Sequence, residues 1–152
     1  MMETLREILA CAQSDDYLAT HVHYLADYDE KLAYALSVGC NVAVNVPIVG
    51  LEACGTSWEK DVANLELLVS THDGGVADVS PGNCLTVSGE READEVESLY
   101  QRLAEALEAW KSDFDLEYWV RRQLEVYLPV VSGERMMEEY LGLVRPFTCG
   151  KA

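Results

Sequence analysis

The chain has 152 residues, 49% of them hydrophobic, and a formal net charge of −16 from 27 acidic and 11 basic residues. A chain of this size buries one core, so we expect a single domain over residues 1–152. No apolar run approaches the roughly 18 residues that a bilayer span needs, which argues against a membrane protein. The negative charge argues against direct binding of nucleic acid, because phosphates are bound mainly by Lys and Arg.

About half of the negative charge lies in residues 90–117, which hold ten acidic and three basic residues. A charged run of this kind is typical of a solvated helix face. A basic protein partner or a salt-rich source would also explain it.

The N-terminus and the cysteines indicate an intracellular protein. Residues 1–7 contain acidic residues where a secretory leader would be basic and then apolar, so we expect no leader. Five cysteines without a C-x-x-C pair fit neither a disulfide framework nor a zinc ribbon, and we expect reduced thiols.

The first third of the chain has helical periodicity. Apolar residues recur on one side of a 3.6-residue period from Met2 to Ala12, and the polar run 14–16 ends this first predicted helix. A loop should follow. Residues 29–38 predict a second helix, which Gly39 can close in the left-handed conformation.

The middle of the chain predicts strands. Residues 41–48 alternate apolar and polar side chains, and alternation resumes in 62–71 after a glycine-containing loop over 50–60. We expect these two runs to pair as antiparallel strands. Residues 72–89 are rich in turn-forming residues and predict an exposed excursion with one short strand at 84–87.

The strongest helical pattern covers residues 92–111, where apolar residues recur every three or four positions. Alternating runs at 124–130 and 140–147, separated by a turn at 132–134, then predict a β-ribbon, although a helix through 136–141 competes with its second arm. Together these elements predict an α+β fold with a mostly antiparallel sheet of about four strands packed against two or more helices.

The pair His21 and His23 is the most suggestive candidate for metal binding, because alternate residues of a strand point to one face. Zinc would need one or two further ligands, and no recognised spacing supplies them. We therefore regard a small metal-dependent enzyme as an alternative only. The other available ligands are Cys40, Cys54, His72 and Cys84.

No other group of residues predicts catalysis. His72 and Asp73 resemble a general base and its orienting carboxylate, but adjacent residues usually form a turn. Cys11 lacks the electropositive surroundings that activate a thiol. Motifs for phosphate loops, dinucleotides, serine hydrolases and zinc proteases are absent. We expect no enzyme activity, no catalytic, cofactor-binding or metal site, no cofactor and no small-molecule substrate.

Three tryptophans could contribute to an interface. Trp110 continues the apolar stripe of the predicted helix 92–111 and should pack in the core. Trp58 lies in the predicted loop after the first strand and is the better surface anchor, because exposed aromatic residues often anchor protein interfaces. Trp119 has no assigned role.

The order of these elements resembles the small tail-completion or tail-terminator proteins of tailed phages and prophages. The resemblance rests on the run Leu5 to Leu9 leading to Asp15 to Ala19, and on the excursion, long helix and terminal β-ribbon. It implies a non-enzymatic structural protein that assembles with itself or with other phage proteins into a ring and that is cytoplasmic until it enters a virion. No functional residue carries over. An acidic protein-binding or DNA-mimicking inhibitor is the alternative, supported by residues 90–117.

Overall fold

The computed structural model of the protein describes residues 2–79 and 83–148. Contacts between residues divide the chain into two units, residues 1–35 and residues 36–152, and each is described by itself. Among the described residues, no helix is both long enough and apolar enough to cross a membrane.

The first unit contains α1 (Met2–Gln13) and α2 (Asp16–His21). The prediction of α1 is confirmed. The loop expected after it is present at residues 22–29 but not at 16–21, because the carboxylate of Asp15 accepts hydrogen bonds of 2.9 Å from the amides of both Tyr17 and Leu18 and so caps a new helix. A third helix, α3 (Glu30–Gly39), follows Asp29 in the sequence. The Asp29 carboxylate accepts a 2.8 Å hydrogen bond from the Leu32 amide at the start of this helix.

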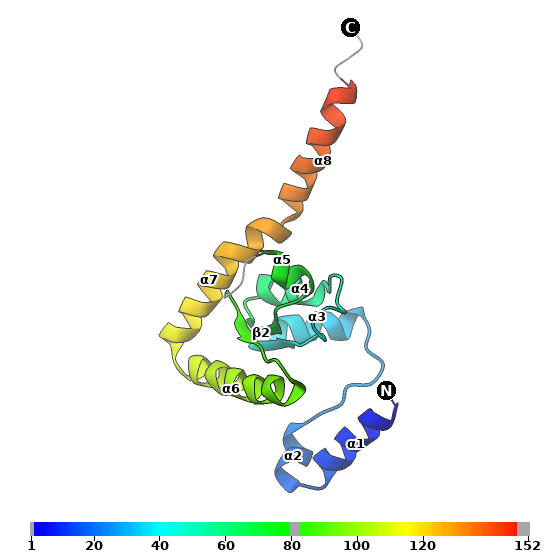
Figure 1. The fold of residues 1–152 in the computed structure, drawn as a ribbon, viewed down its shortest axis with the longest axis vertical. Coiled ribbons are helices and arrows are strands. Elements are labelled where there is room, and N and C mark those ends of the chain that lie inside the picture. Colours follow the sequence, from blue (N-terminus) through cyan, green and yellow to red (C-terminus); the bar gives the residue numbers. More distant parts are fainter. Residues whose placement is uncertain (1, 80–82, 149–152) are drawn as a thin grey trace. The chain divides into compact units, whose positions relative to one another are not determined.

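The second unit is built on three strands, β1 (Val42–Asn45), β2 (Leu67–Thr71) and β3 (Leu85–Val87). Their order is β1-β2-β3 and both pairings are parallel. The predicted antiparallel sheet of about four strands is therefore wrong. Figure 1 shows α6 on one side of β2, and α4 and α5 on the other.

Short helices in the connections explain the parallel pairing. Helix α4 (Ser57–Ala63) joins β1 to β2, and α5 (Gly74–Val79) joins β2 to β3. A connection that returns the chain to the same end of the sheet makes the next strand parallel, whereas a tight hairpin would make it antiparallel. The predicted strand 62–71 thus begins as a helix, turns at Leu65 with a φ of 71°, and becomes a strand only at Leu67.

The sheet is covered on both faces, as parallel sheets usually are. All five residues of β2 are buried. One face packs on α4, α5 and α7, and the other packs on α6. The buried residues of the first face are Ala43, Trp58, Val62, Leu68, Val76, Cys84 and Tyr127. Those of the second face are Leu67, Val69, Leu85, Val87, Ala106 and Ala109.

Helix α6 (Glu92–Lys111) confirms the strongest sequence prediction. Its buried residues are the small Ala106 and Ala109, which let the helix approach the sheet closely. Leu99 and Leu103 of the predicted stripe pack against this core, whereas Leu107 is 48% and Trp110 49% exposed. Packing of Trp110 in the core, as the sequence predicted, is therefore wrong.

The predicted β-ribbon over 124–147 is also wrong, because this part of the chain forms α7 (Asp113–Val131) and α8 (Gly133–Thr148). The alternation in 124–130 is compatible with a helix, since Gln123 and Tyr127 are four residues apart and both are buried. The competing helix through 136–141 is confirmed.

Candidate functional site at the carboxyl edge of the sheet

The three parallel strands end at one edge of the sheet, after Asn45, Thr71 and Val87. The chain that follows them forms the long connection 46–56, the turn at 72–73 and the entry to α6. Ligands of open parallel sheets bind outside the carboxyl ends of the strands. This edge is therefore the candidate site.

Buried polar side chains tie the first two strand ends together. The Asn45 amide donates to the Ser70 hydroxyl over 3.1 Å, and the Thr71 hydroxyl donates to the carbonyl of Pro47 over 2.9 Å. The Ser70 hydroxyl in turn donates to the carbonyl of Thr71 over 2.8 Å. These bonds satisfy polar groups that would be costly in an apolar sheet, and they fix the start of the connection 46–56.

Asp73 organises the rest of that connection. Its carboxylate accepts hydrogen bonds from the amides of Gly50 (2.9 Å) and Glu52 (3.1 Å). Main-chain amides, first that of Glu52 and then that of Gly74, hold the pKa of Asp73 below its usual value. The carboxylate thus stabilises a loop, which agrees with the turn that the sequence favoured over a base and its orienting carboxylate at His72 and Asp73.

Glycines allow the connection to lie against α5. A Cβ at Gly74, whose φ is 52°, would come within 2.9 Å of the Glu52 Cγ, and a Cβ at Gly55 within 2.7 Å of the Glu52 Oε1. At Gly75 a Cβ would meet the Cys54 Sγ at 2.9 Å. The partly exposed side chain of Glu52 therefore lies against Gly55 and Gly74 at the sheet edge.

Trp58 is not the surface anchor that the sequence predicted. The side chain is 1% exposed and makes an edge-to-face contact with Tyr127, with ring centroids 5.3 Å apart. Its position in α4, four residues before the buried Val62, was the missed signal. Trp119 packs at the margin of the α6 core.

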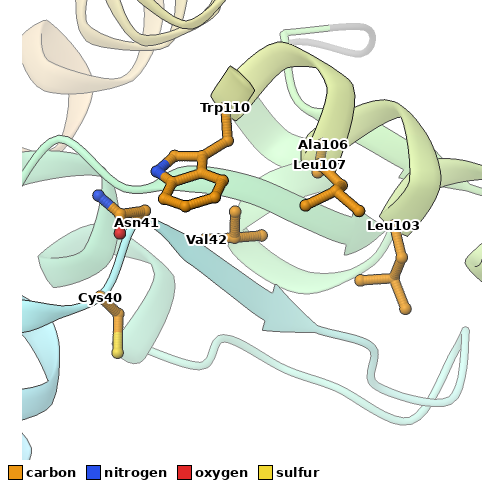
Figure 2. Close-up of a pocket in the computed structure, with 7 residues that line it drawn as sticks. All are labelled: Cys40, Asn41, Val42, Leu103, Ala106, Leu107 and Trp110. Atoms are coloured by element: carbon orange, nitrogen blue, oxygen red, sulfur yellow. The ribbon is translucent and has the colours of Figure 1, made fainter. Parts of the chain in front are cut away.

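An apolar groove lies beside β1, on the side of the sheet that α6 covers. Its volume is about 400 Å³. Figure 2 shows Trp110 above Asn41 and Val42, with Leu107 and Leu103 farther along α6 and the Cys40 side chain pointing away from Trp110. No sequence pattern indicates this groove, because it depends on where α6 crosses the sheet.

In the part of the chain that the structure describes, His21 and His23 are not grouped with further metal ligands. His21 stacks on the Tyr17 ring with centroids 4.0 Å apart, and its Nδ1 lies 2.8 Å from the Tyr17 carbonyl oxygen. His23 follows α2 and is exposed. Throughout residues 2–79 and 83–148, no group of three or more His, Cys, Asp or Glu side chains is placed to hold a metal ion.

The four described cysteines are free thiols. Cys11, Cys40 and Cys54 are exposed, and Cys84 is buried. Burial raises the pKa of the Cys84 thiol, so it is a poor nucleophile. Cys149 lies outside the described residues.

The opposite end of β2 contains a buried acid that the sequence analysis missed. Glu66 is 3% exposed, and its Oε1 has no hydrogen-bond partner. Burial, followed by the nearby carboxylate of Asp61, raises the pKa of Glu66 to about 7. Gln123 bonds to the backbone beside it, accepting from the Leu68 amide and donating to the Glu66 carbonyl, each over 2.9 Å.

Comparison with known proteins finds similarity to glycogen phosphorylases. The chain is 32% identical over 136 residues to the enzymes of Mycobacterium tuberculosis and Mycobacterium bovis, covering 79% of this chain and 16% of theirs. It is 28% identical over 143 residues to the enzyme of Aquifex aeolicus, covering 90% of this chain and 19% of that enzyme. No family model and no solved structure matches the chain.

The chain spans less than a fifth of the length of these curated relatives. A continuous match over this share of the chain must include the whole sheet and its carboxyl-edge loops, wherever it begins. The residues of the candidate site therefore lie within the stretch that matches glycogen phosphorylases.

Proposed function

We propose that this chain acts as one domain of a phosphorylase that uses glycogen or a related glucan, and that the carboxyl edge of its sheet forms one wall of the active site. The observation that carries the proposal is the 32% identity over 136 residues to glycogen phosphorylases. The parallel sheet supports it, because its carboxyl edge is where such folds bind ligands and where Glu52 is held.

The charge of the domain indicates that the other walls come from elsewhere. Phosphorolysis needs cationic groups for the phosphate. The chain has only 11 basic residues. Five of them are engaged in surface ion pairs with Asp or Glu. The paired residues are Arg91, Arg102, Lys111, Arg121 and Arg135. We infer that a larger polypeptide, or a second one, supplies the phosphate-binding groups.

A graft tests this proposal. The 152-residue chain replaces the matching stretch of the M. tuberculosis glycogen phosphorylase, and phosphate consumption with glycogen is measured. We expect activity in the graft. Glu52→Ala in the graft should lower it at least about ten-fold, as the loss of a hydrogen bond to a charged group does.

The matched control is Glu138→Ala, which removes an exposed carboxylate from α8 and should leave the rate unchanged. A graft that folds, as judged by circular dichroism, but consumes no phosphate would refute the proposed function.

A role as a phage tail-completion protein is our second proposal. The terminal β-ribbon that supported it is absent, but α8 has an uncovered apolar face that could join subunits. This face comprises Met137, Tyr140, Leu141 and Val144. The inhibitor alternative keeps only the acidic surface of α6 as support. Both rank below the phosphorylase proposal, which has an aligned sequence behind it.

A further inference from the structure

A pocket of about 460 Å³ lies within the first unit, and none of its lining residues belongs to the candidate site. Helices α1 and α2 lie side by side (Figure 1), and the chain that leaves α2 completes the pocket. All the lining residues fall between positions 9 and 25, so the pocket depends on no part of the second unit.

The two ends of α2 explain why a pocket forms here. The Asp15 carboxylate caps the start of α2, so the chain turns directly from α1 into a second helix. Helix α2 ends at Val22, whose amide donates to the Leu18 carbonyl over 2.8 Å and whose backbone is extended (φ −108°, ψ 116°). Residues 22–25 therefore leave α2 without continuing it, and they line the pocket together with residues of α1.

The pocket offers hydrogen-bonding groups without ionic ones. None of its lining residues is Asp, Glu, Lys or Arg. The Gln13 amide both donates and accepts, and so do the neutral imidazole of His23 and the phenol of Tyr24. Among residues 2–79 and 83–148, the side chains of Gln13 and His23 form no hydrogen bond with the protein. Both groups are therefore available to a ligand.

Apolar side chains supply the rest of the wall. Ala12 is buried, Leu9 is partly buried, and the Tyr24 side chain is 57% exposed. A pyranose ring packs its C–H face on such a surface, while its hydroxyl groups exchange hydrogen bonds with side chains that both donate and accept. A phosphate or a cation would find no opposite charge among the lining residues. The pocket therefore fits a neutral, ring-shaped ligand rich in hydroxyl groups.

We propose that this pocket binds a glucosyl residue of an α-linked glucan, separately from the site of phosphorolysis. The choice of an α-linked glucan rests on the proposed function, because the chain is similar to glycogen phosphorylases. The pocket holds one part of a long polymer while another part reacts. Such tethering raises the effective concentration of the reacting chain ends.

Titration of the isotope-labelled 152-residue chain with maltoheptaose, followed by NMR, tests the inference. We expect saturable binding with a Kd on the order of 1 mM, since the pocket is open and holds one sugar ring. The largest shift changes should occur at Gln13, His23 and Tyr24. Inorganic phosphate should leave these signals unchanged. Absence of saturable binding up to about 10 mM maltoheptaose, or shift changes confined to other residues, would overturn the inference.

Two variants test the polar and the aromatic contribution separately. Gln13→Ala and Tyr24→Ser should each weaken maltoheptaose binding at least about five-fold, because each removes a hydrogen-bonding group and Tyr24→Ser also removes the ring. Tyr28→Ser is the matched control, because Tyr28 is a 68% exposed tyrosine of the same unit that does not line the pocket. Circular dichroism verifies that the variants keep their helices. Undiminished binding in both pocket variants would overturn the inference.

The outcomes for the two proposals are distinguishable, because binding is measured in the isolated chain and phosphorolysis in the graft described above. Binding of maltoheptaose at the pocket, combined with an inactive graft, would refute the proposed function and keep the pocket. An active graft made from a chain that binds no maltoheptaose would keep the proposed function and overturn the pocket.

Discussion

At the scale of single residues, Glu66 is a buried acid whose Oε1 has no hydrogen-bond partner. The pKa of its side chain is raised from 4.5 to about 7 because burial disfavours the carboxylate and Asp61 repels it. A folded-state pKa above the unfolded value means that the folded protein binds the proton more tightly. Its contribution to stability is therefore present below about pH 4.5 and is lost as the pH rises through about 7.

The variant Glu66→Gln should remove this loss. Between about pH 5 and about pH 8, we expect the free energy of unfolding of the wild type to fall relative to the variant by on the order of 1–2 kcal/mol. Urea unfolding at the two pH values measures it. Glu138→Gln on α8 is the control, and its difference from wild type should not change with pH. A constant difference for Glu66→Gln as well would show that Glu66 is not titrating in this range.

At the scale of elements, one side chain joins α7 to β2. The Gln123 side chain is 1% exposed. Its Oε1 accepts from the Leu68 amide and its Nε2 donates to the Glu66 carbonyl, so the side chain bonds to β2 as a neighbouring strand would. The side chain therefore satisfies two buried main-chain groups at the start of β2. These two hydrogen bonds fix the position of α7 along β2.

Gln123→Ala should destabilise the protein by about 1–3 kcal/mol, because it leaves a buried donor and a buried acceptor without partners. Gln101→Ala removes the same side chain from the exposed surface of α6, where it bonds only to Glu97, and should cost less than about 0.5 kcal/mol. Thermal or urea unfolding compares the two. Equal costs would mean that the Gln123 contacts are not formed in solution.

At the scale of the whole molecule, the charge separates the functional proposals. With a net charge of −16, the isolated chain should repel its copies at low salt. If it is a domain of a phosphorylase, we expect it to remain a monomer even at about 1 M salt, where the screening length is about 3 Å. Light scattering across a salt series measures this. A ring that forms as salt is added would instead favour the tail-protein proposal.

The sequence by itself determined the elements whose pattern is local. Helices α1, α3 and α6 follow from apolar residues at helical spacing and from residues that end a helix. The core of β1 and the last part of β2 follow from alternation. The candidate site was visible only as turn-forming residues around Asp73, since its meaning depends on which strand ends lie side by side.

Only the tertiary structure decided how these elements combine. Alternation shows which face of a strand is buried but not the direction of its neighbour, and here the helices in the connections made the sheet parallel. The run 124–130 fits both a strand and a helix, and burial of Gln123 and Tyr127 against β2 and α4 selects the helix. Likewise Trp58 is buried and Trp110 is exposed because α4, α5 and α7 pack together on one face of the sheet, whereas α6 leaves β1 partly open on the other.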